Sequence, residues 1–339
     1  MSDPTPTGSR HRALRPKFLE GNPKGLAILV GGSATALVLV VAAFAWYLIT
    51  GKPISQLPGI NVAVAPTYQF SINGLSRPMG VAVDAQDDRL YVTQSSGDRT
   101  VKVFDLKGQA LSTLATPDDG RDHNPLYVAV DPVSKDIFVS DRGANAIYQY
   151  NVGGVYQGEV KVDGIDHIGT LAIAIDNKQN IYVADAAATP QRIVEFRADG
   201  TKVATFGETL NLNFPNGLVV QDDGSLIVAD SGNSRVIVIE PNGTVRGALE
   251  RGSMDAALGM PRGVAVNAKG TVYVVDTVNQ VIRVFAKDPS GLPTFSTSFG
   301  DVGDLDGQFN YPNGIATDAD GRVYVVDREN GRLQVWQEK

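Results

Sequence analysis

Residues 311–336 read Tyr-Pro-Asn-Gly-Ile-Ala-Thr-Asp-Ala-Asp-Gly-Arg-Val-Tyr-Val-Val-Asp-Arg-Glu-Asn-Gly-Arg-Leu-Gln-Val-Trp. Short apolar runs at Ile315–Asp318, Val323–Val326 and Arg332–Trp336 are separated by turns that contain Asp-Gly and Asn-Gly. Hydrophobic runs bounded by these dipeptides are the strongest short-range signal of a β-hairpin. The segment therefore predicts three short antiparallel strands joined by two tight turns.

The same phrase recurs five more times along the chain. Each copy has a first apolar strand, a turn, and a second strand rich in β-branched and aromatic residues. The copies open at positions 78, 125, 170, 215, 261 and 312, which are 47, 45, 45, 46 and 51 residues apart. Self-similarity at a nearly fixed period is the signature of a repeat architecture.

A fourth, weaker strand lies between copies, as at Gln109–Leu114, Thr201–Phe206 and Thr294–Phe299. Four short antiparallel strands in each repeat of this length make one blade of a β-propeller. Stacked blades bury both faces of their inner strands, which explains why these strands are continuously apolar. We predict an all-β, six-bladed propeller over residues 67–339.

Three phrases carry a resemblance to a known family. They are Pro-x-Gly-Val-Ala-Val-Asp at 78–84, Ile-Tyr-Val-Ala-Asp at 181–185 and Asn-x-Arg-Val-x-Val at 233–238. With the glycine-rich connection at 300–314, they resemble the NHL-repeat six-bladed β-propellers. The resemblance covers about residues 67–339 and implies the fold. It implies little about function, because this scaffold hosts binding proteins and enzymes alike.

The N-terminal part differs in composition from the repeats. Residues 1–24 carry five basic residues against Asp3 and Glu20, and we interpret them as a disordered tail. Leu26–Ile49 then contains no charged residue, and about 20 apolar residues are enough to cross a bilayer. We predict a transmembrane helix at 25–50, followed by a proline-containing linker at 51–66.

The charge distribution predicts the orientation of this helix. Basic residues flank its N-terminal side, which places the N-terminus in the cytoplasm and the propeller outside, at the cell membrane. Trp46 and Tyr47 lie at the far end, where aromatic rings favour the membrane interface. A cleaved signal peptide ending near Ala43-Phe44-Ala45 is the alternative.

One strand is spare at the start of the propeller, and one is missing at its end. Thr67–Ile72 precedes the first repeat, whereas the last repeat supplies three strands. We predict that Tyr68–Ile72 completes the sixth blade as its outer strand and so covers two exposed edges. The linker would then leave from the face opposite the inter-blade loops, and these loops would face away from the membrane.

The face that collects the inter-blade loops is the predicted binding surface, because loops on a rigid scaffold commonly carry function. We expect it to contact a protein, peptide or glycan; the alternative is a merely solvated loop surface. The predicted binding residues are Arg77, Met79, His123, Asn124, Leu126, Tyr127, His167, Asn216, Arg262, Tyr311 and Asn313.

Recurrent aspartates end the second strands, at positions 141, 185, 230, 276 and 327. Aspartate accepts backbone N–H bonds in turns, so we interpret them as structural. A shared axial metal is the alternative, but Gln94 takes this position in the first repeat. We assign no catalytic residue, metal ligand or cofactor, and leave calcium or zinc open.

Enzymes of similar architecture provide the alternative function, a metal-dependent lyase or hydrolase. Peptide-amidating lyases resemble this fold and hold zinc with three histidines, whereas the propeller sequence has only His123 and His167. Calcium lactonases of the propeller class use Glu, Asn and Asp near the axis. Asn216 and Asn313 match such positions, but no glutamate accompanies them.

Charge and cysteine content exclude other classes. Removing the tail's five basic and two acidic residues from the totals of 30 and 37 leaves 25 against 35, a net charge of −10. An acidic domain argues against nucleic-acid binding. The sequence contains no cysteine, so neither disulfides nor thiolate metal sites form.

Overall fold

The structure, a computed structural model, describes residue 49 and residues 64–249, 258–287 and 292–339. The predicted tail at 1–24, nearly all of the predicted transmembrane helix at 25–50 and most of the linker at 51–66 lie outside these ranges. Within them, no helix has the length and apolar character needed to span a bilayer.

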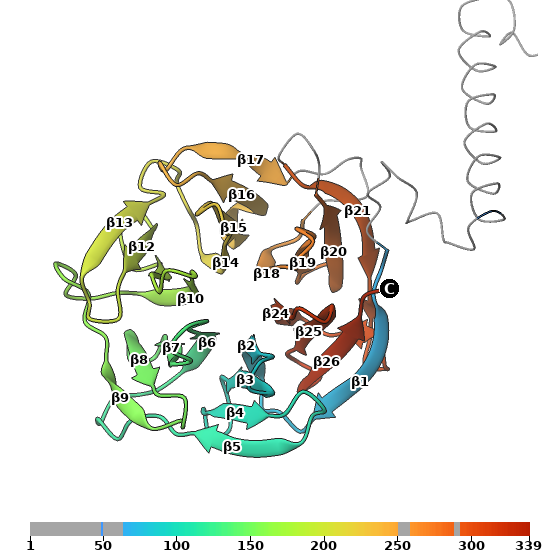
Figure 1. Ribbon diagram of the computed structural model, residues 1–339, viewed down its shortest axis with the longest axis horizontal. Coiled ribbons are helices and arrows are strands. Elements are labelled where there is room, and N and C mark those ends of the chain that lie inside the picture. The colour runs from blue at the N-terminus through green and yellow to red at the C-terminus, as the bar shows by residue number, and fades with distance from the viewer. Residues whose placement is uncertain (1–48, 50–63, 250–257, 288–291) are drawn as a thin grey trace, which may run out of the picture. The chain divides into compact units, whose positions relative to one another are not determined.

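Six four-stranded antiparallel sheets surround a central axis, as the repeats predict (Figure 1). Blade 1 contains β2 (Pro78–Asp84), β3 (Arg89–Gln94), β4 (Val101–Phe104) and β5 (Ala110–Leu114). Blade 2 contains β6 (Pro125–Val130), β7 (Ile137–Asp141), β8 (Ala146–Tyr150) and β9 (Tyr156–Glu159). Blade 3 contains β10 (Thr170–Ile175), β11 (Ile181–Asp185), β12 (Arg192–Phe196) and β13 (Lys202–Phe206).

The remaining blades follow the same plan. Blade 4 contains β14 (Pro215–Val220), β15 (Leu226–Asp230), β16 (Arg235–Ile239) and β17 (Val245–Leu249), with a 3-10 turn, η2 (Ser231–Asn233). Blade 5 contains β18 (Pro261–Val266), β19 (Val272–Asp276), β20 (Val281–Ala286) and β21 (Thr294–Phe299). Blade 6 contains β24 (Pro312–Thr317), β25 (Arg322–Asp327), β26 (Arg332–Gln337) and β1 (Thr67–Asn73), and a parallel pair, β22 (Asp301–Val302) and β23 (Gln308–Phe309), precedes it.

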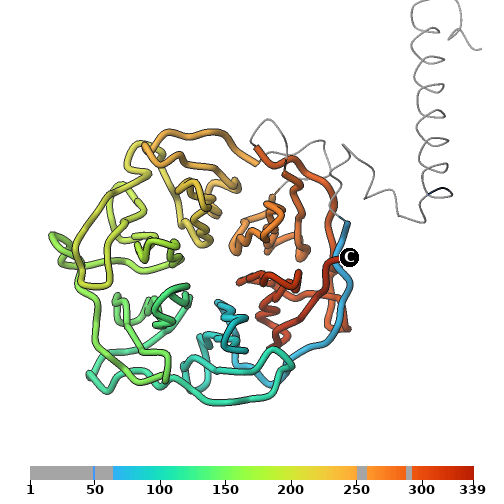
Figure 2. The backbone as a smooth tube through the Cα atoms, in the orientation of Figure 1, coloured from blue at the N-terminus to red at the C-terminus, as the bar shows by residue number. Residues whose placement is uncertain are grey.

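The first described strand closes the ring, which confirms the prediction for Tyr68–Ile72. β1 pairs antiparallel with β26, so that Thr67 lies opposite Gln337 and Asn73 opposite Arg332. Figure 2 shows the two ends of the propeller chain running side by side. β24 starts at the inter-blade loops and β26 ends at the opposite face, so the chain enters β1 from that opposite face.

Apolar packing between neighbouring blades forms the core. The second strand of each blade is buried along nearly its whole length; Val323, Tyr324 and Val325 of β25 are wholly inaccessible. Outer strands such as β5 face solvent along most of their length. The continuous apolar runs of the sequence therefore report burial on both faces, as predicted.

Each inner strand begins earlier than its apolar run suggests. β24 starts at Pro312 rather than Ile315, and its register with β25 shifts between these two residues. The inner strands of the other five blades have a comparable shift directly after their first residue. Such bulges re-aim side chains, and here they act at the end of the strand that lies nearest the inter-blade loops.

The recurrent aspartates are structural, as interpreted from the sequence. Asp327 Oδ1 accepts a bond from the backbone N–H of Asn310, 2.7 Å away, and Oδ2 accepts one from Arg332 Nε at 2.7 Å. The same arrangement recurs at Asp185, Asp230 and Asp276, each paired with an arginine of the third strand. These carboxylates hold the loop before the blade as well as the turn after the second strand, and only the turn was indicated by the sequence.

Candidate ligand site at the axial mouth

The axial mouth is the end of the central channel at which the six inner strands begin. The second residue of each inner strand contributes one side chain to a ring there. The ring consists of Met79, Leu126, Leu171, Asn216, Arg262 and Asn313. It is uneven, because blades 1–3 supply apolar side chains and blades 4–6 supply polar ones.

The next position of the strands is small in every blade but one. It is glycine in four blades and Ala172 in blade 3. A Cβ on Gly314 would lie 2.5 Å from the carbonyl oxygen of Met79, and one on Gly80 would lie 2.7 Å from that of Leu126. Inner strands of neighbouring blades therefore approach too closely for a larger residue.

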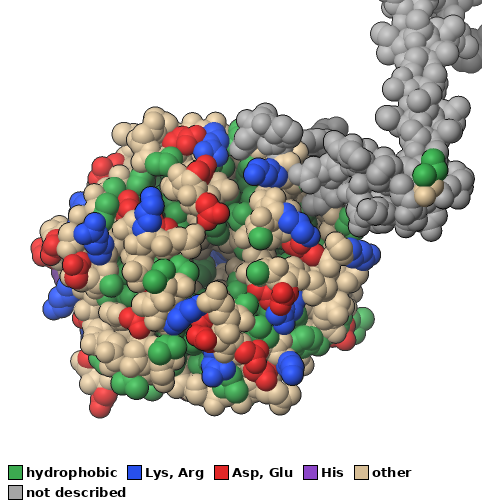
Figure 3. All heavy atoms as spheres, viewed as in Figure 1, with side chains coloured by type: hydrophobic (Ala, Val, Ile, Leu, Met, Phe, Trp, Pro, Cys, Tyr) green, Lys and Arg blue, Asp and Glu red, His purple; other side chains and the backbone are tan. Residues whose placement is uncertain are grey.

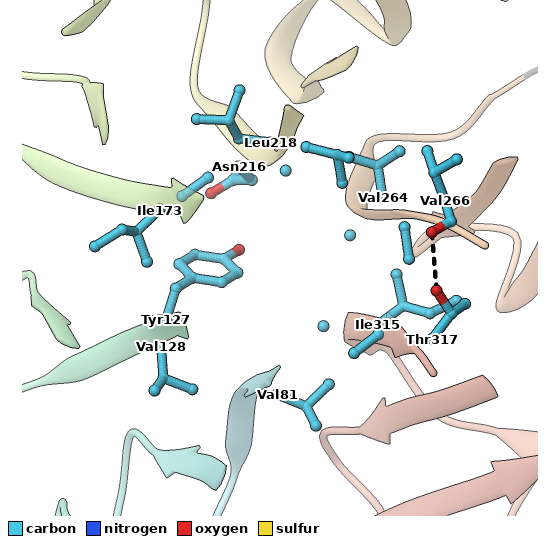
Figure 4. Close-up of a pocket in the computed structure, with 17 residues that line it drawn as sticks. Val81, Tyr127, Val128, Ile173, Asn216, Leu218, Val264, Val266, Ile315 and Thr317 are labelled. Atoms are coloured by element: carbon cyan, nitrogen blue, oxygen red, sulfur yellow. Dashed lines mark hydrogen bonds between the residues drawn. The ribbon is translucent and has the colours of Figure 1, made fainter. Parts of the chain in front are cut away.

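Tyr127 is the exception at this position, and its ring projects into the axial channel (Figure 4). The cavity there has a volume of about 220 Å³. Most of the side chains that line it are apolar, among them Val81, Val128, Ile173, Leu218, Val264 and Ile315, and Asn216 and Thr317 add polar groups. A hollow is visible at the centre of the propeller face in Figure 3. The phenol is the main polar group that enters this apolar space.

Asn313 organises the polar half of the ring. Its side chain is wholly buried, and its Nδ2 donates to the carbonyl oxygen of Met79 at 2.8 Å and to the hydroxyl of Tyr127 at 3.3 Å. Arg262 Nη1 donates to Asn313 Oδ1 at 3.0 Å. These bonds use the donors and the acceptor of one amide to orient a guanidinium and a phenol toward each other.

A second group of charges lies beside this network. Arg77 Nη2 donates to Glu329 Oε1 at 2.9 Å, and Arg328 Nη1 lies 3.1 Å from the same oxygen. Burial lowers the pKa of Arg328, and the positive charges of Arg77 and Arg262 lower it further, whereas Glu329 and Tyr127 oppose this. Three arginines and one glutamate leave a local charge of about +2 in an acidic domain.

Two guanidinium nitrogens in this group have no partner. Arg262 Nε and Arg328 Nε are both buried, and neither donates a hydrogen bond to any other residue in the ranges that the structure covers. Buried donors are nearly always satisfied, so an unpaired one calls for an explanation. Burial raises the pKa of Tyr127, and the positive charges of Arg262 and Arg328 partly oppose this.

Bulky apolar residues stand immediately before the inner strands of blades 4–6. Phe214, Met260 and Tyr311 have φ values of 49°, 56° and 50°, in the left-handed region. Their exposed fractions are 52%, 39% and 48%. A non-glycine residue with such a φ is strained, and strain of this kind gathers at binding sites. Met260 Sδ lies 3.7 Å from Arg262 Nη2, which connects this apolar rim to the ring.

The predicted binding residues occupy different depths. Arg77 and Tyr311 are exposed, whereas Asn124, Asn216 and Arg262 are half-buried. The sequence placed Met79, Leu126, Tyr127 and Asn313 on the open rim, but the structure buries all four. The reason is the bulge after the first strand residue together with the close approach of neighbouring blades. Tyr127 therefore lines the axial cavity, and the other three are buried between neighbouring blades rather than on an outer contact surface.

The two histidines do not form a joint site. His123 Nδ1 lies 2.9 Å from Asp141 Oδ2, and His123 Nε2 lies 3.1 Å from Asp119 Oδ1. His123 thus takes the place that arginine has beside the aspartate of other blades. His167 is exposed, and no hydrogen bond joins it to His123 in the part of the chain described.

Sequence reasoning missed four residues of the mouth: Phe214, Met260, Arg328 and Glu329. The first two occupy the position of Tyr311 in the repeat, and aligning the blades on their prolines would have found them. Arg328 follows the recurrent aspartate, where blades 4 and 5 have Ser231 and Thr277. The strained φ values and the unpaired Nε atoms had no signal in the sequence.

The donor set of the mouth determines which ligands it suits. Amides, guanidinium groups and a phenol lie close together there. The positive charge of Arg262, which is part of the ring, would repel a cation. Calcium requires several oxygen ligands, usually including carboxylates. Across the described ranges, no group of three or more His, Cys, Asp or Glu side chains is placed to hold a metal ion. These residues fit an anion better than calcium or zinc.

Two family descriptions match the chain. Residues 64–255 match the SMP-30/Gluconolactonase/LRE-like region, and residues 258–285 and 309–336 match the NHL repeat. The first match covers more than half of the sequence and the second covers two blades. Together they extend over nearly the whole propeller.

Similar proteins include two curated relatives. The protein SUPPRESSOR OF QUENCHING 1, chloroplastic, of Arabidopsis thaliana is 21% identical over 268 residues, which are 63% of this chain and 25% of that protein. NHL repeat-containing protein 3 of Mus musculus is 28% identical over 190 residues, which are 49% of this chain and 51% of that protein. The chain thus spans from a quarter to about half of these relatives' length.

Solved structures show the same fold. A streptogramin B lyase superposes with a TM-score of 0.59 at 16% identity, covering 80% of this chain and 97% of the lyase. Virginiamycin B lyase from Staphylococcus aureus superposes with a TM-score of 0.57 at 13% identity, covering 80% and 99%. At these identities the likeness concerns the fold alone.

Proposed function

Because the chain belongs to the SMP-30/gluconolactonase/LRE-like family of propellers, with NHL repeats in its last two blades, we propose that the propeller is a ligand-binding or sensor module whose site is the axial mouth. The observation that carries the proposal is the uneven ring. Asn216, Arg262 and Asn313 form one side and Met79, Leu126 and Leu171 the other, above an apolar cavity of about 220 Å³.

This arrangement has the usual composition of a ligand site. Binding pockets are largely apolar and carry a few placed polar groups that orient the ligand. Most side chains below the ring are apolar, and the few polar ones are Tyr127, Asn216 and Thr317. A purely structural ring would have no need of unpaired guanidinium donors, because unpaired buried donors cost free energy.

The proposal includes the location of the module. The uncharged segment at 26–49 supports a membrane anchor, and the basic residues before it support a cytoplasmic N-terminus. The bilayer would then be one partner, through residues 25–50. The chain enters the propeller at the end opposite the mouth, which supports a mouth that a protein, peptide or glycan outside the membrane would be able to reach.

An enzymatic role is the second candidate, a metal-dependent lyase or hydrolase. It is favoured by the family match and by the fold shared with the streptogramin B lyase. The side chains at the mouth support it less, because Glu329 is its one acidic group and is paired with Arg77 and Arg328. The Tyr127 hydroxyl stays protonated at neutral pH and can donate a hydrogen bond, because burial raises its pKa above the usual value.

One experiment separates the two roles. The full-length protein, purified in detergent, is screened by thermal shift against a library of small metabolites and short peptides. Each compound that binds is then incubated with the protein and analysed by mass spectrometry. Recovery of an unchanged compound supports a binding module, whereas a new product assigns an enzyme.

Two variants locate the site. Asn216→Trp would fill the mouth with an indole and is expected to abolish binding. Asn177→Trp, in the turn after β10 at the opposite end of the blades, is the matched control and is expected to bind normally. Ligands that bind equally to both variants would show that the mouth is not the site.

A further inference from the structure

We propose that the axial mouth recognises a carboxylate group joined to an apolar body. This deepens the proposed function and rests on it. Two sources have this chemistry, the C-terminal end of a peptide and a free small carboxylic acid. The groups that would bind the anion are Arg262, Arg328 and Tyr127.

Arg262 and Arg328 each have an unpaired hydrogen-bond donor. Arg262 uses Nη1 to bind Asn313, and Arg328 uses Nη1 to contact Glu329, while the Nε atom of each is buried without a partner. Arginine presents its donors as a planar fork that matches the two oxygens of a carboxylate. A bound carboxylate would satisfy donors that the protein itself leaves free.

The hydroxyl of Tyr127 has an unused proton. Only 8% of this residue is exposed, and its hydroxyl points into the axial cavity (Figure 4). The hydroxyl oxygen accepts a bond from Asn313, but no acceptor for its proton is found in the described part of the chain. A buried phenol with an unused proton is a donor placed for a ligand acceptor.

The side chains around the mouth carry an excess of positive charge. Arg77, Arg262 and Arg328 face a single acidic side chain, Glu329, whereas residues 25–339 as a whole carry a net charge of −10. A local excess of about two positive charges beside a cavity with apolar walls concentrates positive potential. Such a site attracts anions, whereas the rest of the acidic surface repels them. The positive charge of the three arginines therefore favours binding of an anion at the mouth.

The apolar side chains around the mouth favour an apolar anion over inorganic phosphate. The ring positions of blades 1–3 hold the buried side chains of Met79, Leu126 and Leu171, and most side chains that line the cavity below are apolar. The exposed rim before blades 4–6 adds the side chains of Phe214, Met260 and Tyr311. A ligand that contacts all of these groups would place its carboxylate beside the arginines of blades 5 and 6. Its apolar part would pack against the apolar side chains of the cavity and the rim.

Four probes test the ligand class. A hexapeptide of alanine and phenylalanine, acetylated at its N-terminus, is prepared with a free C-terminal carboxylate and as the C-terminal amide. Phenylacetate and inorganic phosphate are the other two. Binding to the full-length protein is measured by calorimetry at two salt concentrations, because attraction between charges weakens as salt is added.

Matched variants test the residues. Arg328→Gln removes the charge beside the mouth, and Arg142→Gln removes the arginine at the same position of blade 2, where Nη1 binds Asn145. We expect Arg328→Gln to weaken carboxylate binding about tenfold or more, the scale of one charge-assisted hydrogen bond, and Arg142→Gln to leave it unchanged. Tyr127→Phe keeps the ring and is expected to weaken binding about fivefold.

The affinities of the four probes distinguish the possible ligand classes. Tighter binding of the free-acid peptide than of its amide supports the proposal and assigns a peptide terminus; phenylacetate binding as tightly as that peptide supports it and assigns a small acid. Equal binding of acid and amide, phosphate binding as tightly as phenylacetate, or equal effects of the two arginine variants would overturn it. If neutral ligands still bind and Asn216→Trp blocks them, the carboxylate inference fails while the proposed function stands.

Discussion

Asn313 donates a hydrogen bond from its side-chain amide to the hydroxyl of Tyr127, 3.3 Å away, and so joins blade 6 to blade 2 at the axial mouth. The two residues are 186 positions apart in the chain. Both are buried, and each departs from the residue type most frequent at its position in the other repeats. The contact shows how a nearly symmetric scaffold acquires one distinctive site through single exchanges within its repeats.

The buried aspartates should contribute most of the stability of the inter-blade loops. Asp327→Ala removes the acceptor of Asn310 and leaves the charge of Arg332 buried without its carboxylate partner. We expect a loss of about 3–5 kcal/mol in the free energy of unfolding, measured in urea. Asp320→Ala, at an exposed ion pair, should cost less than about 0.5 kcal/mol. Similar losses for both would contradict the structural role.

Closure of the ring by β1 predicts a sharp dependence on the N-terminal boundary. A chain that begins at residue 64 retains β1, whereas one that begins at residue 75 exposes the edge of β26 and uncovers Trp336, which packs edge-on against Tyr68. We expect the shorter chain to lose at least about 3 kcal/mol, as for the loss of one large buried side chain. Equal urea midpoints of the two chains would show that β1 is dispensable.

Acid stability should depend on Glu338. Burial alone would raise its pKa, but hydrogen bonds from Asn267, Lys269 and Tyr273 outweigh this and hold the pKa below its ordinary value of 4.5. A depressed pKa stabilises the fold above the unfolded value, and this stability is lost as the pH falls through the folded value. Wild type should therefore lose stability below about pH 4.5 more steeply than Glu338→Gln. Parallel pH profiles of Tm for the two proteins would contradict this.

Tyr311 should lower the stability of the fold while contributing to ligand binding. Its left-handed φ of 50° costs an L-residue roughly 1–2 kcal/mol, part of which glycine regains. Tyr311→Gly should therefore raise the free energy of unfolding by about 0.5–1 kcal/mol while weakening phenylacetate binding. Ser234→Gly, at a φ of 50° in an exposed turn, should stabilise the protein without affecting binding. A Tyr311→Gly variant with unchanged affinity would remove Tyr311 from the site.

Much of the architecture was predictable because repetition reinforces local signals. Pairs of apolar strands joined by polar turns recur with nearly constant spacing, so errors at one blade are corrected by the others. Thr294–Phe299 was predicted with the bounds that β21 has. The inner strand of blade 6 began at Ile315 in the prediction and begins at Pro312 in the structure, because a bulge directly after Pro312 separates this residue from the apolar run that indicated the strand.

The site was only partly predictable, for a physical reason. Arg262, Asn216 and Tyr311 stand at repeat positions that indicate the face, and they were predicted. Whether a residue borders the channel or lies on the outer surface depends on how closely neighbouring blades approach. That distance is a property of the packed ring, and no local pattern reports it.

The sequence alone was sufficient to predict the number of blades, the order of the strands and the N-terminal strand that completes blade 6. These features follow from local hydrogen-bonding and burial patterns. The packed ring was needed to bring Tyr127, Arg262, Asn313 and Arg328 together, since they lie in three blades. It also left two guanidinium nitrogens buried without partners. Contacts between blades that are distant in sequence depend on the closure of the whole toroid, and only the folded molecule contains that information.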